Sequence, residues 1–506
     1  PIRMLVYGAG DAINGAGALD TQIHAQISRL LQVVTNQYVA AVAQLDAART
    51  PAWRFLLDPW GRHRPMQVEE FNTGDPDALL RFVEWGMQVI PARRTVLVLS
   101  GHGMAWEDDL ARQVLGTRSL TRLPSPPEKE APRGVRHHTR RLFGHNLDKV
   151  GTLSRAVLID GHSRDFLSNA ELASACERIA SRLPGGRIDA LIFDACLMSS
   201  WELLQEVSDS VRTVVASVDE LSAAGVDLAQ PARALTEARG ELDAPQIAAT
   251  FASHFAPQTS FDSCVAIDLS KPEWSLALNH FHNFATRLNG WVRSAPGNRE
   301  TVRNALRVAA TSVVKFTSGG LADAAALAQA VEGMSGVPGE CVQSLKAAVS
   351  TARSCVLGKQ VGQDYQSATG LSLFAPNSAT VYNTNRPEYL RLEFPNVTGW
   401  GSVLDAVYGR ENVYTRFIQE AIPPTRGVAG LVAPTAEAQP EEALPSTEFL
   451  VAVRGVKLDS EVREGIEEAI RSVVLRVLGS AELRGELHIS PLRKFAKEQG
   501  LELSPE

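Results

Sequence analysis

The sequence predicts an α/β fold in which a mostly parallel sheet is flanked by helices. Short apolar runs bounded by turn residues recur along the first 230 residues, and helical segments separate several of them. The runs 96–99 and 188–193 are largely apolar, which is typical of parallel strands covered on both faces. With 506 residues, of which 44% are apolar and 21% charged, the chain can form a large core and more than one domain.

The first part of the chain alternates strands and helices. Strands are expected at residues 3–7, 38–45, 53–57, 95–99, 156–160, 188–193 and 212–216, with helices such as 76–89 and 169–182 between several of them. Alanine-rich amphipathic stretches follow, so residues 245–365 are expected to be a largely helical subdomain. Strand-like runs occur at 264–267 and 371–375. Residues 1–422 are treated as one unit.

The last part of the chain differs in composition. Residues 423–447 are rich in Pro, Ala and Glu, which is typical of a linker. Residues 448–506 predict a strand and then a helix beginning at Asp459 or Ser460, a module too small to be comfortably stable alone. This module is expected to dock on residues 1–422 or to pair with a regulatory partner. A structural extension, an inhibitory tail, a sensor contact and a tether remain open.

Two junctions between a buried strand and a loop carry the chemistry. The run TVLVLSGHG contains His102, and the run IDALIFDACLMSS contains Cys196. Functional residues of open α/β sheets gather beyond the carboxyl ends of the strands, so the thiol and the imidazole are expected to meet there. Together they suit nucleophilic attack on a carbonyl, whereas either residue alone is usually structural. The amides of Gly103 and Cys196 are candidates for binding the oxyanion.

The segments around these two residues resemble a known family. SGHG and DACLM, with Glu202 on the following helix, resemble the clostripain-like cysteine peptidases of the C11 family, which have a caspase-like fold. Further segments fit the same family, from about residue 2 to about residue 421: MLVYGAGDAING with Asp11, VLIDGHSRDFLSNAEL, VRTVVASVDE, SCVAIDLSKPEWSLALNHF and ATGLSLFAPNSATVY. The resemblance implies that the strands at 264–267 and 371–375 return to the main sheet.

The resemblance also implies an acidic pocket for the substrate side chain. It places Asp194 at the base of this S1 pocket, where a carboxylate pairs with Arg or Lys. Asp194 precedes Cys196 by two positions, so the two side chains are expected on the same side of one strand. The alternative is that Asp194 ends the strand and caps the next helix. Further S1 candidates are Asp219, Glu220 and Asp227, although the aromatic residue usual in this family loop is missing.

A basic insertion at 107–155 separates His102 from Cys196. It explains why the interval exceeds the roughly 50 residues of a caspase. Prolines, serines and glycines without apolar periodicity predict an exposed loop. A solvated loop, a nucleic-acid patch and a self-cleavage region are the alternatives, and cleavage is favoured because interleaved aromatics are missing. The candidate cleavage residues are Arg118, Arg122, Arg133, Arg136, Arg140, Arg141, Lys149 and Arg155.

Composition excludes several other classes. No apolar run approaches the ~20 residues that cross a bilayer, and no signal peptide is recognisable, so a cytoplasmic location is expected. Five cysteines without paired spacing argue against a disulfide framework or a zinc site. The net charge of −7 gives no general case for nucleic acid as a partner. No cofactor is expected, and calcium is suggested only by analogy with clostripain.

The sequence thus predicts a cysteine endopeptidase that cleaves protein or peptide substrates after Arg, with Lys as a second choice. Cys196 is the nucleophile and His102 the acid and base. A regulated or self-processing bacterial protease is one form of this hypothesis. Two alternatives stay open: a catalytically silent caspase-like scaffold, and a thiol amidase or acyltransferase that uses the same dyad.

Overall fold

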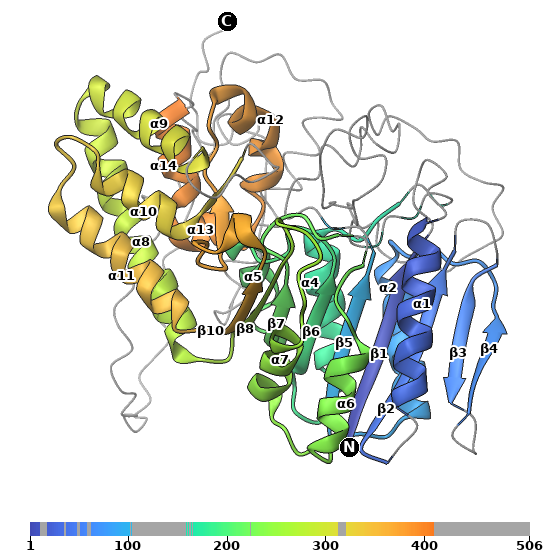
Figure 1. Cartoon of the computed structure of the whole chain (residues 1–506). Coiled ribbons are helices and arrows are strands. Elements are labelled where there is room, and N and C mark those ends of the chain that lie inside the picture. The colour runs from blue at the N-terminus through green and yellow to red at the C-terminus, as the bar shows by residue number, and fades with distance from the viewer. Residues whose placement is uncertain are drawn as a thin grey trace, which may run out of the picture. The chain divides into compact units, whose positions relative to one another are not determined.

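The computed structural model describes residues 1–10, 18–34, 37–47, 51–57, 62–101, 165–222, 224–311 and 320–408, and the single residues 103, 158, 160 and 163. By its contacts the chain divides into two compact units, Pro1–Pro423 and Pro424–Glu506, and every described residue lies in the first (Figure 1). The predicted insertion at 107–155, the linker at 423–447 and the C-terminal module at 448–506 lie outside the described residues.

A nine-stranded sheet forms the centre of the first unit. Its strand order is β10-β8-β7-β6-β5-β1-β2-β3-β4. The five strands from β7 to β2 are parallel, and the outer strands pair antiparallel. The strands are β1 Ile2–Ala9, β2 Val39–Asp46, β3 Trp53–Leu57, β4 His63–Gln67, β5 Arg94–Ser100, β6 Ile188–Asp194, β7 Val211–Ala216, β8 Ser263–Asp268 and β10 Val356–Val361.

Helices cover both faces of this sheet because its central strands are apolar on both sides. On one face lie α1 (Ala18–Val33), α6 (Ala229–Glu237) and α7 (Ala244–Ser253), and on the other lie α2 (Pro76–Val89) and α4 (Asn169–Ala180), as Figure 1 shows. Local signals set where helices begin. Ser168 and Glu171 form a capping box at the start of α4, in which each side chain accepts a backbone N–H of the other residue.

A second group of helices follows in the chain. It comprises α8 Pro272–Ser294, α9 Pro296–Ala310, α10 Ala324–Glu332, α11 Gly339–Arg353, η1 Gln363–Tyr365, α12 Ala379–Tyr389, α13 Glu393–Thr398 and α14 Trp400–Tyr408, with the short strands β9 Leu321–Asp323 and β11 Ser372–Phe374. Aromatic contacts join this group to α5 (Trp201–Val207). The ring of Phe281 lies 5.1 Å from that of Trp201 and 5.6 Å from that of Trp400. The helical group is thus packed directly on the helix that follows Cys196.

Most predicted strands are confirmed to within a few residues, and three features differ. The strand expected at 371–375 pairs with β9 in a separate two-stranded sheet and does not return to the main one. Residues 245–365 contribute β8, β10 and most of α7 to the main sheet and its cover, so only α8–α11 of this stretch form the helical group. Of the strand expected at 156–160, only Leu158 and Asp160 are described, and Asp160 forms an isolated bridge with Asp165.

Candidate active site

The two predicted junctions lie side by side in the sheet. Strands β5 and β6 are parallel neighbours, and their last residues, Ser100 and Asp194, are register partners. The next residue after β5, Gly101, donates its backbone N–H to the carbonyl of Asp194 at 3.2 Å. The loop that contains His102 and the turn that contains Cys196 therefore start from the same point at the edge of the sheet.

Cys196 lies in a turn beyond β6 and not on the strand. The strand ends at Asp194, and Leu197 adopts a left-handed backbone with φ of 62°. Such a conformation is uncommon for a leucine and is held here by a hydrogen bond from the Leu197 N–H to the Asp219 carbonyl at 2.9 Å. The expectation that Asp194 and Cys196 share one strand is wrong, because the alternation of side chains stops where the strand stops.

The thiol of Cys196 faces the segment that follows β7. The side chain is buried, with 2% of its surface exposed. The backbone N–H of Leu221 points to Sγ at 3.2 Å, and Sγ lies 3.8 Å from the Leu221 carbonyl. This segment thus covers the sulfur atom from the side of the next strand.

Gly103 packs on the backbone of the nucleophile. A Cβ atom added at Gly103 would lie 2.4 Å from the carbonyl oxygen of Cys196 and 2.8 Å from its nitrogen, so no side chain fits here. The backbone of Gly103 therefore lies directly against that of Cys196. His102 itself lies outside the described residues.

Asp194 is fully buried beside this turn. Its Oδ2 accepts a hydrogen bond from the Ser100 hydroxyl at 2.5 Å, and its Oδ1 accepts one from the Val226 N–H at 2.7 Å. The alternative role as a helix cap is wrong, because Ser200 caps α5 by accepting the N–H of Leu203. Asp194 instead joins β5, β6 and the segment after β7.

The other acidic candidates occupy different positions. Asp219 is buried, and its carboxylate accepts a hydrogen bond from the Tyr365 hydroxyl, whose pKa is raised by burial and by this neighbouring charge. Glu220 is partly buried in the same segment. Asp227 accepts the N–H of Ala229 at 2.9 Å, and so it lies at the start of α6. The structure brings Asp194 and Asp219 to the Cys196 turn and places Asp227 at a helix start.

Glu202, on α5, is a buried carboxyl group close behind the nucleophile turn. Its Oε1 accepts the Phe374 N–H at 2.8 Å and the Tyr389 hydroxyl at 3.1 Å. Burial raises the pKa of Glu202 to about 7. Sequence reasoning used this residue only as part of a motif and missed its electrostatic character, because its burial depends on β11 and α12, which lie far away in the sequence.

Other predicted features can be placed only in part. All candidate cleavage residues and Asp11 lie outside the described residues. No disulfide bond joins the five cysteines, which are all described and buried. Among the described residues, no three His, Cys, Asp or Glu side chains form a group that could hold a metal ion, and no helix is both long and apolar enough to span a bilayer.

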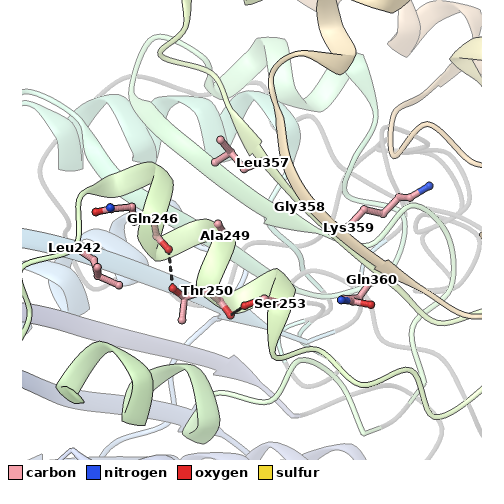
Figure 2. A pocket seen from close by; sticks show the side chains of 9 residues that line it. All are labelled: Leu242, Gln246, Ala249, Thr250, Ser253, Leu357, Gly358, Lys359 and Gln360. Atoms are coloured by element: carbon pink, nitrogen blue, oxygen red, sulfur yellow. Dashed lines mark hydrogen bonds between the residues drawn. The ribbon is translucent and has the colours of Figure 1, made fainter. Parts of the chain in front are cut away.

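A cavity of about 500 Å³ lies elsewhere, between α7 and β10 (Figure 2). Its walls are formed mainly by uncharged polar and aliphatic side chains, among them Gln246, Thr250 and Ser253, together with the charged Lys359. The Thr250 hydroxyl donates to the Gln246 carbonyl at 2.7 Å, as Figure 2 shows. The cavity walls hold no thiol, imidazole or carboxylate, so the turn around Cys196 remains the candidate active site.

Comparison with known proteins agrees with this site. The model of the clostripain family, peptidase family C11, matches residues 144–406, a stretch that includes Asp194 and Cys196 and begins after His102. The fold is similar to that of a secreted C11 cysteine protease from Bacteroides thetaiotaomicron (15% identity, 78% of this chain and 98% of that chain covered, TM-score 0.50). It is also similar to an inactive zymogen C11 protease from Parabacteroides distasonis (16% identity, 79% and 98% covered, TM-score 0.50). No curated protein matches this sequence.

The structure therefore has the mixed α/β architecture of the caspase-like cysteine proteases, with a large sheet flanked by helices. The chain belongs to the clostripain family and is a cysteine peptidase.

Proposed function

We propose that this peptidase cleaves proteins after Arg, with Lys as a second choice, through a dyad of Cys196 and His102. One observation carries the dyad: the residues on both sides of His102 contact the nucleophile turn. Gly101 donates a hydrogen bond to the Asp194 carbonyl, and Gly103 packs on the backbone of Cys196. These contacts of its two chain neighbours support the choice of His102 as the acid and base.

The proposed reaction uses only groups of this chain. The Cys196 thiol gives its proton to His102, and the sulfur attacks the carbonyl carbon of the scissile peptide bond. The carbonyl oxygen becomes an oxyanion that the Gly103 and Cys196 amides stabilise. As the carbon–nitrogen bond breaks, His102 gives a proton to the leaving amine. Water then hydrolyses the thioester and returns the enzyme. No cofactor takes part in these steps, and a calcium requirement is an analogy with clostripain alone.

Selection of basic side chains is assigned to Asp194. A carboxylate pairs with a guanidinium or an ammonium group, and the hydrogen bonds from Ser100 and Val226 fix the orientation of this one. Because the group is fully buried, a substrate without a positive charge would leave the carboxylate uncompensated. The nearby Asp219 and Glu220 are proposed to add to the negative potential, and Asp227 is a weaker candidate.

We also propose that the activity of the peptidase is regulated by self-cleavage and by a partner. Cleavage within the basic insertion by the enzyme itself would follow from its preference for basic residues, and the C-terminal module is proposed to receive a partner. A reducing compartment such as the cytoplasm suits five cysteines that form no disulfide bond. An active enzyme that migrates intact on a denaturing gel would count against obligatory processing.

The test is hydrolysis of fluorogenic peptides that end in Arg, Lys, Asp or Leu. We expect turnover of the Arg peptide to fall at least about a thousandfold in Cys196→Ala, because the nucleophile is lost. Cys341→Ala, which removes a buried cysteine of α11, is the matched control and should keep its activity. Turnover without preference for Arg or Lys would refute the acidic pocket and favour a thiol amidase or acyltransferase.

A further inference from the structure

The carboxylate of Asp262 holds the segment that covers the nucleophile. Asp262 is fully buried and lies directly before β8. Its Oδ1 accepts the N–H of Ser222 at 2.6 Å, and its Oδ2 accepts the Ser222 hydroxyl at 3.0 Å. Oδ2 also accepts the N–H groups of Gln258 at 2.7 Å and Thr259 at 2.9 Å. Four donors to one side chain make a strong, directional anchor.

The residue that Asp262 holds, Ser222, is next to the residue that contacts the Cys196 thiol. Ser222 follows Leu221, whose N–H points to the Cys196 sulfur at 3.2 Å. The neighbour of the anchor, Ser263, fixes the start of the same segment, because its hydroxyl accepts the Val218 N–H at 2.9 Å. The residues from Val218 to Ser222 are thus held at both ends by two adjacent residues of the β8 strand region. None of these contacts is signalled by a motif in the sequence.

We propose that Asp262 is a positioning residue for the peptidase reaction. It fixes Leu221 and Ser222 beside Cys196, and so it sets how far the thiol is covered and where the wall of the substrate pocket stands. The effect on catalysis rests on the proposed function, whereas the effect on access to the thiol does not.

The substitution Asp262→Asn tests whether this side chain holds the segment beside Cys196 or only contributes to the stability of the fold. An amide oxygen in the place of Oδ2 can still accept the Gln258 and Thr259 N–H groups, but the amide nitrogen then faces the Ser222 N–H and cannot accept it. Asp262→Asn therefore frees mainly the segment beside Cys196. Asp268→Asn is the matched control, because Asp268 is a buried carboxylate at the other end of β8 that accepts only local donors of Ser270 in the contacts described.

The experiment measures two properties of the full-length enzyme. The first is the rate at which iodoacetamide alkylates Cys196, followed by mass spectrometry of the peptide that contains it. The second is kcat/KM on the Arg peptide. In Asp262→Asn we expect alkylation to become about threefold faster or more, because the segment opens, and kcat/KM to fall about tenfold, because the pocket wall is misplaced. General loosening of the fold would also speed alkylation of the other four buried cysteines, so the positioning role requires faster alkylation of Cys196 with the other four unchanged.

Ser222→Ala keeps the main-chain hydrogen bond and removes only the hydroxyl contact, so it should shift both quantities in the same directions by less. If Asp262→Asn does not fold, Ser222→Ala alone tests the positioning role of Asp262. Wild-type alkylation in both variants, or an equal change in Asp268→Asn, would overturn the proposal. Iodoacetamide carries no basic group, so faster alkylation in an enzyme that ignores Arg peptides would support the positioning role and refute only the proposed specificity.

Discussion

Two fully buried carboxyl groups bracket the nucleophile turn, and they are held in different ways. Asp194, at the end of β6, accepts hydrogen bonds on both oxygens, with the Ser100 hydroxyl on Oδ2 and the Val226 N–H on Oδ1. Glu202, in the first turn of α5, accepts both of its hydrogen bonds on Oε1, and its Oε2 has no hydrogen-bond partner among the described residues. The two carboxyl groups are thus equally buried, but in the described part of the chain Asp194 has hydrogen-bond donors on both oxygens and Glu202 on only one.

The two carboxyl groups connect the nucleophile turn to different parts of the fold. The donors to Asp194 come from the strand beside it and from the segment that covers the thiol, so this carboxylate belongs to the candidate active site. The donors to Glu202, Phe374 and Tyr389, belong to β11 and α12. A carboxyl group without donors on one oxygen favours its neutral form when it is buried. The environment of Glu202 thus favours a bound proton.

The largest expected effect concerns Glu202 and the pH dependence of stability. Its pKa rises from 4.5 in the unfolded chain to about 7 in the folded one, mainly through burial. The folded state therefore retains a proton that the unfolded state has lost, so this stabilisation is complete below pH 4.5 and disappears as the pH rises through 7. The loss should reach about 3 kcal/mol in the free energy of unfolding.

Urea unfolding of wild type and Glu202→Gln from about pH 4 to pH 8 measures this loss directly. The difference between the two proteins should change across the window, because glutamine does not titrate. Glu177→Gln, at an exposed site of α4, is the control and should follow the wild-type curve. Parallel curves for wild type and Glu202→Gln would show that Glu202 has an ordinary pKa and would remove the contrast with Asp194.

The next effect concerns Asp194 and selectivity. Asp194→Asn removes the charge; its amide oxygen can still accept the Val226 N–H, and its amide nitrogen can donate to the Ser100 hydroxyl. We expect kcat/KM on Arg and Lys peptides to fall about a hundredfold, while hydrolysis of a Leu peptide changes little. Asp189→Asn removes a charge at the opposite end of β6, where the carboxylate lies 3.9 Å from Arg94 and from Arg212, and it should leave selectivity unchanged. Equal losses on all peptides would assign Asp194 a structural role only.

Much of the fold could be predicted because its central strands have a simple pattern. β1, β5 and β6 are almost entirely apolar, since helices cover both faces, and short apolar runs between turns are visible in a sequence. The edge strand β4 was missed because its sequence, HRPMQ, is exposed, carries a proline and shows no apolar alternation. β10 was missed for a similar reason, since VLGKQV is only partly buried.

The site could be predicted only as residue types at strand ends. The sequence placed Cys196 and Asp194 at the end of β6, but it did not show that the strand stops at Asp194 or that Leu197 has a left-handed backbone. It also gave no sign of Leu221 or Asp262. Their contacts join residues 25 to 40 positions apart, and such contacts follow no period. They depend on the tertiary arrangement of β6, β7 and β8.

The smallest of these effects tests the close contact between the two junctions. Gly103→Ala adds a Cβ atom that would lie 2.4 Å from the Cys196 carbonyl oxygen, a backbone atom that cannot turn aside. The loop must therefore shift, and the Gly103 amide with it, so kcat/KM should fall about tenfold while KM changes little. Gly297→Ala, at a position in α9 where an added Cβ meets nothing within 4 Å, is the control. Unchanged kcat in a folded Gly103→Ala enzyme would show that the Gly103 amide does not bind the oxyanion, and the site would then depend on the β6 side of the contact alone.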